Sequence, residues 1–373
     1  HYTNAESSAA SDVYKRQCPR LAPDSPGALH FCGSRAVSSK AERVAVVLNG
    51  NARQVTDELV ESFDQLVGAG DLFLSRSLDE VQDIAVEIVE AGYPVVLTGG
   101  GDGTFVQMVT SITNEARNRN HEPPSFGLLR LGTGNSLAWA LGAGTSRKGV
   151  LADLARLHHD SAHKEVRLLE AQGLLSPFAG AGFDALGLKH FHEVRSLVRH
   201  LPWVGRRATG ALSYAISIPL LTIPELALRP RLQVRIINHG AAERLDRDGR
   251  PTGAPIDPGE PIFEGGCIAA LASTIPYWGF GARVFPFAEN RPSDRFCLRV
   301  VATSPLHVAA HMLSAWRGTY RADDLIDVYA EDIELQFDRE TPIEIGGDPA
   351  GMTRSMRVRL HPDPVKLIDY ATP

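Results

Sequence analysis

The stretch from Val95 to Thr104, VVLTGGGDGT, constrains the fold of this chain more than any other. An aliphatic run ends in three glycines, an aspartate, a glycine and a threonine, and a helical pattern begins at Phe105. This order predicts a buried strand, a tight loop and a helix. Glycines let the backbone adopt positive φ and let an anion approach the main chain, and the helix directs free N–H groups towards that anion. The stretch therefore predicts a phosphate-binding loop; glycines that only allow close helix–strand packing are the simpler alternative.

A second glycine loop follows the next predicted strand. Ser125 to Leu131 forms that strand, GTGN occupies residues 132–135, and a helical pattern starts at Ser136. Two consecutive βα units place their loops side by side at the carboxyl edge of a parallel sheet, where open α/β folds bind ligands. The spacing is neither GxGxxG nor GxxxxGK[ST], and no lysine stands at the P-loop position. The two loops together predict a cleft for a polyphosphate.

GGGDGT followed by LGTGN resembles the diacylglycerol kinase catalytic domain, which bacterial diacylglycerol and related lipid kinases share with sphingosine and ceramide kinases. GGDGT alone is also similar to the loop of NAD kinases and phosphofructokinases, whereas GTGN favours the lipid kinases. The resemblance extends from about Arg43 to the C-terminus. It implies a kinase that uses ATP and Mg²⁺ to transfer the γ-phosphate to a lipid hydroxyl, in diacylglycerol, a sphingoid base or a similar lipid.

The resemblance also implies which residues contact the nucleotide. Asn49 is the only matching residue of the family's Asn-Pro-x-Ser-Gly loop, and Ser75 stands where the family often has a threonine. Asp102 is expected to orient Mg²⁺ through water. The complete set expected at the nucleotide is Asn49, Ser75, Gly99, Gly100, Gly101, Asp102, Gly103, Thr104, Gly132, Thr133, Gly134 and Asn135. For Asn49 and Ser75, the alternative is that they only satisfy their own turns.

Three aspartates of the second half match family segments. Asp348, in GGDPAG, matches the acid that takes the proton from the acceptor hydroxyl. Asp184, in AGAGFDA, would orient a lipid hydroxyl or amine, and Asp294, in RPSDRF, would bind a structural magnesium with backbone carbonyls. For Asp184 and Asp294 the alternative is an ordinary aspartate in a turn or at a helix end.

Among the positions that depart from the family pattern are Gln107, Ser136 and Gly346. They leave open a catalytically inactive lipid- or nucleotide-binding protein. An NAD kinase-like enzyme is the other alternative, because it would share GGDGT and a two-domain layout.

The order of predicted elements divides the chain into three parts. Residues 1–40 lack periodicity and are interpreted as a disordered or non-native extension. Residues 41–160 alternate strands and helices and predict an α/β nucleotide-binding domain with a parallel sheet. Residues 161–373 predict a β-rich acceptor domain, a β-sandwich whose last strands return towards the first domain. Two helices are expected within it, at Arg207–Leu221 and at Leu306–Trp316.

Composition limits the partners. The formal net charge is −6, which gives no basic field for nucleic acid. The four cysteines lack metal-site spacing, and the apolar stretch from Ala211 to Leu226 is too interrupted by prolines to span a bilayer. We expect a cytoplasmic protein that contacts membranes peripherally during turnover on a lipid substrate, and a homodimer stays open.

Overall fold

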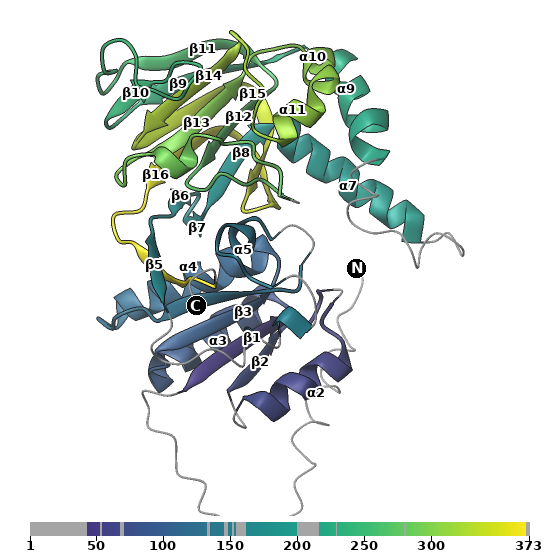
Figure 1. Ribbon diagram of the computed structural model, residues 1–373, viewed down its shortest axis with the longest axis vertical. Helices are drawn as coiled ribbons and strands as arrows, with labels where there is room; N and C mark the ends of the chain where they lie inside the picture. The colour runs from purple at the N-terminus through teal and green to yellow at the C-terminus, as the bar shows by residue number, and fades with distance from the viewer. Residues whose placement is uncertain are drawn as a thin grey trace, which may run out of the picture. The chain divides into compact units, whose positions relative to one another are not determined.

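The computed structural model describes residues 43–52, 54–67, 71–132, 135–144, 148–150, 153, 162–199, 216–228, 230–279 and 281–370 (Figure 1). The extension expected over residues 1–40 lies outside these ranges. Thr133 and Gly134 of the second glycine loop lie outside them as well.

The first part of the chain alternates strands and helices, as its sequence predicts. Its elements are β1 (Val44–Asn49), α2 (Asp57–Leu66), β2 (Leu72–Ser75), α3 (Leu78–Ala91), β3 (Val95–Gly100), α4 (Asp102–Asn118), β4 (Ser125–Arg130) and α5 (Ser136–Ala140). The strands lie in the order β2-β1-β3-β4, and each neighbouring pair is parallel. All six residues of β3 are buried, so the strand before the first glycine loop lies in the middle of the core.

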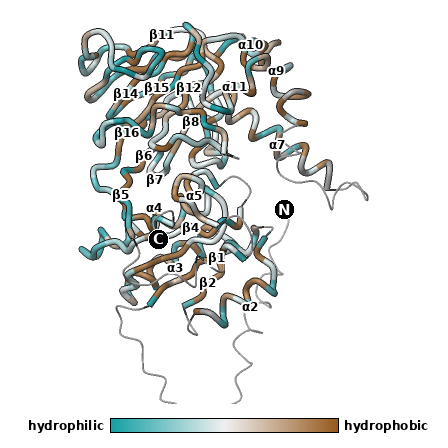
Figure 2. The backbone as a smooth tube through the Cα atoms, in the orientation of Figure 1, coloured by the Kyte–Doolittle hydropathy of each residue, from teal (hydrophilic) through white to brown (hydrophobic). Residues whose placement is uncertain are grey.

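Helix α3 shows how local sequence sets these boundaries. Ser77 caps its N-terminus by accepting a hydrogen bond from the backbone N–H of Glu80 at 3.2 Å, and the Glu80 carboxylate accepts one from the N–H of Arg76. Gly92 ends the helix in the left-handed conformation, with φ of 67°. The apolar stripe predicted from the sequence packs against the sheet. Figure 2 shows hydrophobic residues along α3 and along the neighbouring strands.

Two further strands complete the first sheet. β17 (Val365–Ile368), near the end of the chain, pairs parallel with β4 and antiparallel with β5 (His163–Val166). The six-stranded sheet therefore combines strands from both ends of the described chain, and its order is β2-β1-β3-β4-β17-β5.

The second part is an antiparallel β-rich region, consistent with the expected sandwich. Its strands are β6 (Leu169–Ala171), β7 (Leu174–Ser176), β8 (Phe178–Gly182), β9 (Leu232–Asn238), β10 (Ala242–Arg244), β11 (Pro261–Cys267), β12 (Ala269–Ser273), β13 (Phe296–Val301), β14 (Leu325–Ala330), β15 (Asp332–Ile345) and β16 (Asp348–Leu360). β15 pairs with β9 near its start and with β8 near its end, with register shifts between. One long strand thus joins two groups of strands, and apolar residues from both groups form one buried cluster.

Helices accompany this region: α7 (Phe183–Arg199), the π-helical turn η2 (Ile218–Thr222), α9 (Ile223–Leu228), the 3₁₀ turn η3 (Ala288–Asn290), α10 (Pro305–Ala310) and α11 (Met312–Trp316). Within the described ranges, none is long and apolar enough to cross a bilayer.

Two expected helices need correction. Of the helix expected at 207–221, residues 207–215 lie outside the described ranges, and the described end continues to Leu228. It passes Pro224 at the point where the π-helical turn η2 changes into α9. The helix expected from Leu306 to Trp316 divides at His311, whose backbone leaves helical geometry (φ −108°, ψ 15°) and whose ring Nδ1 lies 3.0 Å from the His307 carbonyl oxygen.

Candidate active site

The first glycine loop is tighter than its sequence predicts. Gly99 and Gly100 are the last residues of β3, Gly101 caps α4, and Asp102 is the first helical residue. The expectation of positive φ is wrong for this loop, since its glycines all lie outside that region. Their role is close approach: a Cβ on Gly99 would collide with Leu48, and one on Gly100 with Thr104. The absence of side chains lets the end of β3 pack closely against β1 and α4.

The two glycine loops touch each other. Strands β3 and β4 pair so that Gly100 lies opposite Arg130, the last residue of β4. Two residues later, a Cβ on Gly132 would collide with the backbone of Gly101. The sequence expectation that the loops meet at one sheet edge is therefore met in the structure. Neither loop carries a side chain at this point. Both loops lead into helix N-termini, whose free N–H groups can bind an anion.

Asn49 and Ser75 end the first two strands at the same sheet edge. The two residues pair across β1 and β2. Asn49 Nδ2 donates to Thr104 Oγ1 at 2.9 Å, so it ties β1 to the first turn of α4. Ser75 is buried, with 4% of its surface exposed, which leaves little of it for a ligand. Nucleotide contact by either residue stays a prediction.

Asp102 links the two glycine loops. Its carboxylate accepts hydrogen bonds from the N–H groups of Ser136 (2.7 Å) and Leu137 (3.2 Å), the first residues of α5. Burial raises the pKa of Asp102, the two N–H groups lower it, and the nearby charge of Asp348 raises it further. The first role visible for this side chain is to hold α5, and with it the second loop, against the first.

The second loop uses an unusual backbone at Asn135. This residue adopts left-handed geometry with φ of 44°, which asparagine tolerates better than most residues. Its Nδ2 donates to the carbonyl oxygen of Gly132 at 2.5 Å. Ser136, which departs from the family pattern, accepts a hydrogen bond on Oγ from the N–H of Gly279 at 2.7 Å. A segment of the β-rich region is thereby fixed to the N-terminus of α5.

Asp348 meets the first glycine loop from the β-rich region. It is the first residue of β16, directly after a two-residue hairpin turn formed by Gly346 and Gly347, whose φ values are 62° and 82°. Its exposed carboxylate lies against Gly103, so that a Cβ on Gly103 would overlap it. The two acids named as catalytic from the sequence, Asp348 and Asp102, are close enough to interact electrostatically.

The structure explains why Gly346 departs from the family pattern. Its positive φ favours glycine, and a Cβ there would collide with Val106 of α4. An acidic side chain at this position would strain the turn that carries Asp348.

Two features of the site were not predicted. Glu344 is 2% exposed and accepts a hydrogen bond from the N–H of Gly347 at 2.8 Å, so a buried carboxylate supports the turn before Asp348. The sequence does not indicate it, because a glutamate between two isoleucines of a strand is expected on the polar face. The other feature is Arg130, whose guanidinium stacks 4.5 Å from the ring centre of Trp139. No sequence pattern indicates that contact.

Of the two remaining aspartates, only Asp294 has a described side chain, and the structure does not bring it into this group. Asp184 is in the first turn of α7, but its side chain lies outside what the structure describes. Asp294 is in an exposed turn, and its carboxylate is 2.6 Å from Arg295 Nη1. The expected magnesium, bound by this carboxylate and backbone carbonyls, stays a prediction. Elsewhere in the described ranges, no cluster of three or more metal-ligating side chains was found.

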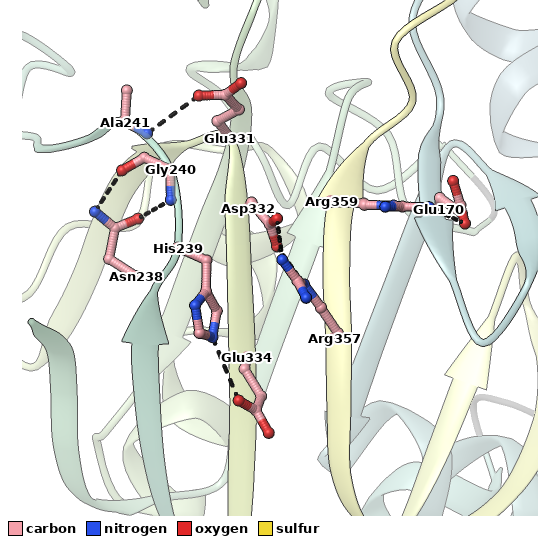
Figure 3. A network of polar contacts seen from close by, with 10 residues as sticks. All are labelled: Glu170, Asn238, His239, Gly240, Ala241, Glu331, Asp332, Glu334, Arg357 and Arg359. Atoms are coloured by element: carbon pink, nitrogen blue, oxygen red, sulfur yellow. Dashed lines mark hydrogen bonds and ion pairs between the residues drawn. The ribbon is translucent and has the colours of Figure 1, made fainter. Parts of the chain in front are cut away.

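Charged side chains also line a hollow of about 500 Å³ away from the glycine loops, where Glu170, Glu331, Asp332, Arg359 and His361 gather. Figure 3 shows the neighbouring network, in which Asp332 pairs with Arg357 and Glu170 with Arg359 across adjacent strands. Exposed pairs of this kind contribute about 0–1 kcal/mol each. Their charges are already paired, so we interpret this network as a stabilising surface.

The described parts of two glycine loops, two helix N-termini and a nearby pair of carboxylates thus lie together. Residues 43–166 match the model of the diacylglycerol kinase catalytic domain. The first part of the chain is thus similar to the catalytic domain of a lipid kinase family. No curated protein matches the chain.

Solved structures support the same fold. Two crystal structures from Bacillus anthracis str. Sterne, one described as a diacylglycerol kinase and the other provisionally so, are 15% and 17% identical. Both have a TM-score of 0.57 and cover 88% of this chain, and the matches span 97% and 98% of those chains. An NAD kinase from Archaeoglobus fulgidus in complex with ATP is 11% identical, with a TM-score of 0.42 over 88% of this chain and 94% of its own. The first two likenesses show the fold, and the third is too remote to support an argument.

Proposed function

We propose that the protein is an ATP-dependent lipid kinase, which transfers the γ-phosphate to the hydroxyl of diacylglycerol, a sphingoid base or a similar lipid. One observation carries the proposal: the carboxylate of Asp348 lies against Gly103, in the first turn of the helix that begins at the glycine loop. A carboxylate that can accept a proton therefore lies beside the backbone N–H groups that would bind the phosphate.

In this proposal the two glycine loops bind the ATP phosphates. Residues Gly99 to Thr104 and Gly132 to Asn135 contribute backbone N–H groups and the positive ends of α4 and α5. Asp102 keeps the loops together through its bonds to the α5 backbone. Phosphoryl transfer requires mainly positioning and charge stabilisation, which a fixed pair of loops can supply.

Asp348 is proposed to take the proton of the acceptor hydroxyl. As the lipid oxygen attacks the γ-phosphorus, its O–H bond breaks and the proton moves to the Asp348 carboxylate. The new O–P bond forms, the bond from the γ-phosphorus to the bridging oxygen breaks, and ADP leaves with that electron pair. A positioned general base of this type contributes about 10²–10⁴-fold to a rate.

Mg²⁺ would enter with the nucleotide, bound to phosphate oxygens and to one or two carboxylates. Asp102 would orient the ion through water, and the positive charge of the ion would offset the repulsion between the Asp102 and Asp348 carboxylates. Bound there, the ion would neutralise charge on the transferring phosphate. The structural magnesium expected at Asp294 is not required by this mechanism.

The lipid acceptor is proposed to bind in the β-rich region, with Asp184 contacting its polar end. Such an acceptor requires peripheral contact with a membrane. Support comes from exposed apolar side chains on helices α9, α10 and α11, of which α10 contacts the other two. Leu228, Leu306, Leu313 and Trp316 are 87%, 66%, 62% and 45% exposed. A homodimer is neither required by the mechanism nor in conflict with it.

The test is transfer of labelled phosphate from Mg-ATP to diacylglycerol, sphingosine or NAD, each offered separately to the full chain. A labelled lipid that disappears with Asp348→Asn supports the proposal. Labelled NADP would instead indicate an NAD kinase-like enzyme. Binding of Mg-ATP without transfer to any of the three would indicate a binding protein.

A further inference from the structure

The proposed phosphate cleft contains two carboxylates, whereas its glycine loops contain no lysine or arginine. Backbone N–H groups and helix ends carry only partial charges. A polyphosphate beside Asp102 and Asp348 would therefore benefit from a full positive charge. Arg130 is placed to supply one, because it is the last residue of β4, lies opposite Gly100 and precedes Gly132 by two residues.

The side chain of Arg130 leaves the sheet on the side of α4 and α5. Its neighbours Leu128 and Leu137 belong to the core cluster on that side, whereas Leu129 belongs to the other. The guanidinium stacks over Trp139 of α5 and interacts electrostatically with Asp102. The charge of Arg130 thus lies beside the junction of the two loops.

The guanidinium of Arg130 is incompletely satisfied. Its Nε is buried and has no hydrogen-bond partner among the described residues. Burial lowers the pKa of Arg130, and only the Asp102 charge opposes that effect. Arg299 shows how the same protein satisfies an arginine with a structural role: two of its nitrogens donate to the Asp327 carboxylate at 2.7 and 2.9 Å, and a third donates to the Val284 carbonyl.

Stacking on Trp139 also limits how the guanidinium can turn. An aromatic face holds the planar group by cation–π attraction and leaves its edge, with the N–H donors, available. The edge of a guanidinium matches two oxygens of a phosphate group, which a lysine cannot reproduce.

We propose that Arg130 is a phosphate-binding residue of this cleft, which contacts the terminal phosphate of the bound nucleotide and is held in place by Trp139. The proposal rests on the proposed function, because it requires a nucleoside triphosphate between the glycine loops. It adds a full positive charge to a site whose other donors are backbone groups. A structural role, in which Arg130 only balances Asp102, is the competing explanation.

The experiment measures binding of Mg-ATP, Mg-ADP and adenosine to the full chain by calorimetry, for wild type, Arg130→Met and Arg130→Lys. We expect Arg130→Met to weaken Mg-ATP by about tenfold or more, to weaken Mg-ADP much less and to leave adenosine unchanged. Arg130→Lys should recover only part of the loss, because it restores the charge without the fork of donors. Arg119→Met, at the far end of α4 where Arg119 pairs with Glu90, is the matched control and should bind all three as wild type does.

Two outcomes would overturn the assignment. Equal affinities of wild type and Arg130→Met for Mg-ATP would remove Arg130 from the phosphate site while leaving the proposed function intact. Equal losses for Mg-ATP and adenosine, together with a lower unfolding temperature, would show a structural role. A wild-type protein that binds no Mg-ATP would overturn the proposed function itself, and the Arg130 assignment with it.

Discussion

The carboxylate of Asp348 occupies the space that a side chain at position 103 would need. Gly103 is in the first helical turn of α4, and Asp348 begins a strand of the β-rich region, so the contact joins the glycine loop to an acid from a distant part of the sequence. Only glycine at 103 lets that acid lie so close to the helix N-terminus. The fourth glycine of GGGDGT thus makes room for a carboxylate as well as for a ligand.

Asp348→Asn should separate chemistry from binding. The amide keeps the shape of the side chain but cannot take a proton, so we expect phosphate transfer to fall by about 10²–10⁴-fold. The affinity for Mg-ATP should change little, because the glycine loops remain intact. Labelled-phosphate transfer and calorimetry measure the two quantities.

Asp323→Asn, at an exposed position paired with Arg247, is the control for Asp348→Asn and should behave as wild type. Full turnover in Asp348→Asn would assign the proton acceptor elsewhere.

Gly103→Ala should act through Asp348. The added methyl group displaces the carboxylate, and a misplacement of about 1 Å can lower a rate by about 100-fold. Gly187→Ala in α7 is a matched control, because the nearest atom to a Cβ there is 3.9 Å away. Adding Gly103→Ala to Asp348→Asn should lower transfer little further. If the losses of transfer rate in the two single variants multiply in the double variant, Gly103 acts independently of Asp348.

Glu344→Ala tests the support of the turn that carries Asp348. The substitution removes the acceptor for the Gly347 N–H and leaves it without this partner, which we expect to lower the free energy of unfolding by about 1–3 kcal/mol. Phosphate transfer should fall as well, since the turn positions Asp348. Urea unfolding measures the change in the free energy of unfolding. Glu340→Ala, exposed on the same strand, should cost less than about 0.5 kcal/mol; an equal loss in both variants would contradict a special role for Glu344.

The local part of this site could be predicted from the sequence. The two glycine loops follow consecutive buried strands, and that pattern alone places them at one sheet edge, where Gly101 and Gly132 meet. The reason for the glycines could not be predicted, because close approach and positive φ both select glycine. Only the backbone of Gly99 to Gly103 distinguishes the two causes.

Contacts between segments that are distant in the sequence were harder to predict. The family resemblance named Asp348, but its contact with Gly103 depends on the β15–β16 turn and its buried Glu344. The stacking of Arg130 on Trp139 depends on how α5 packs against β4, and no local pattern encodes such a contact. Asp294 shows the opposite case, since its motif matched but Arg295 pairs with the carboxylate.

The raised pKa of Asp102 predicts a pH dependence of stability. The folded protein binds this proton more tightly than the unfolded chain, so the stabilising contribution is complete below the unfolded pKa, about 4, and is lost as pH rises through the folded pKa. Asp102→Asn removes the titration. The unfolding free energy of wild type minus that of the variant should therefore fall as pH rises from about 4 to about 7.

Urea unfolding at several pH values measures this difference, and Asp323→Asn should not reproduce its trend. A difference that grows with pH would mean that the hydrogen bonds from Ser136 and Leu137 outweigh the cost of burying the charge of Asp102.

Exposed leucines on α9, α10 and α11 predict how the protein reaches a lipid acceptor. Replacing Leu228, Leu306 and Leu313 by serine should weaken binding to phosphatidylcholine–phosphatidylglycerol vesicles by about tenfold or more, because each buried leucine contributes about 1.5–3 kcal/mol. Transfer to a short-chain, water-soluble acceptor should stay unchanged, since these side chains are not part of the proposed site. Leu78→Ser, 67% exposed on α3, is the control. Vesicle binding equal to wild type in the triple variant would place the membrane contact elsewhere.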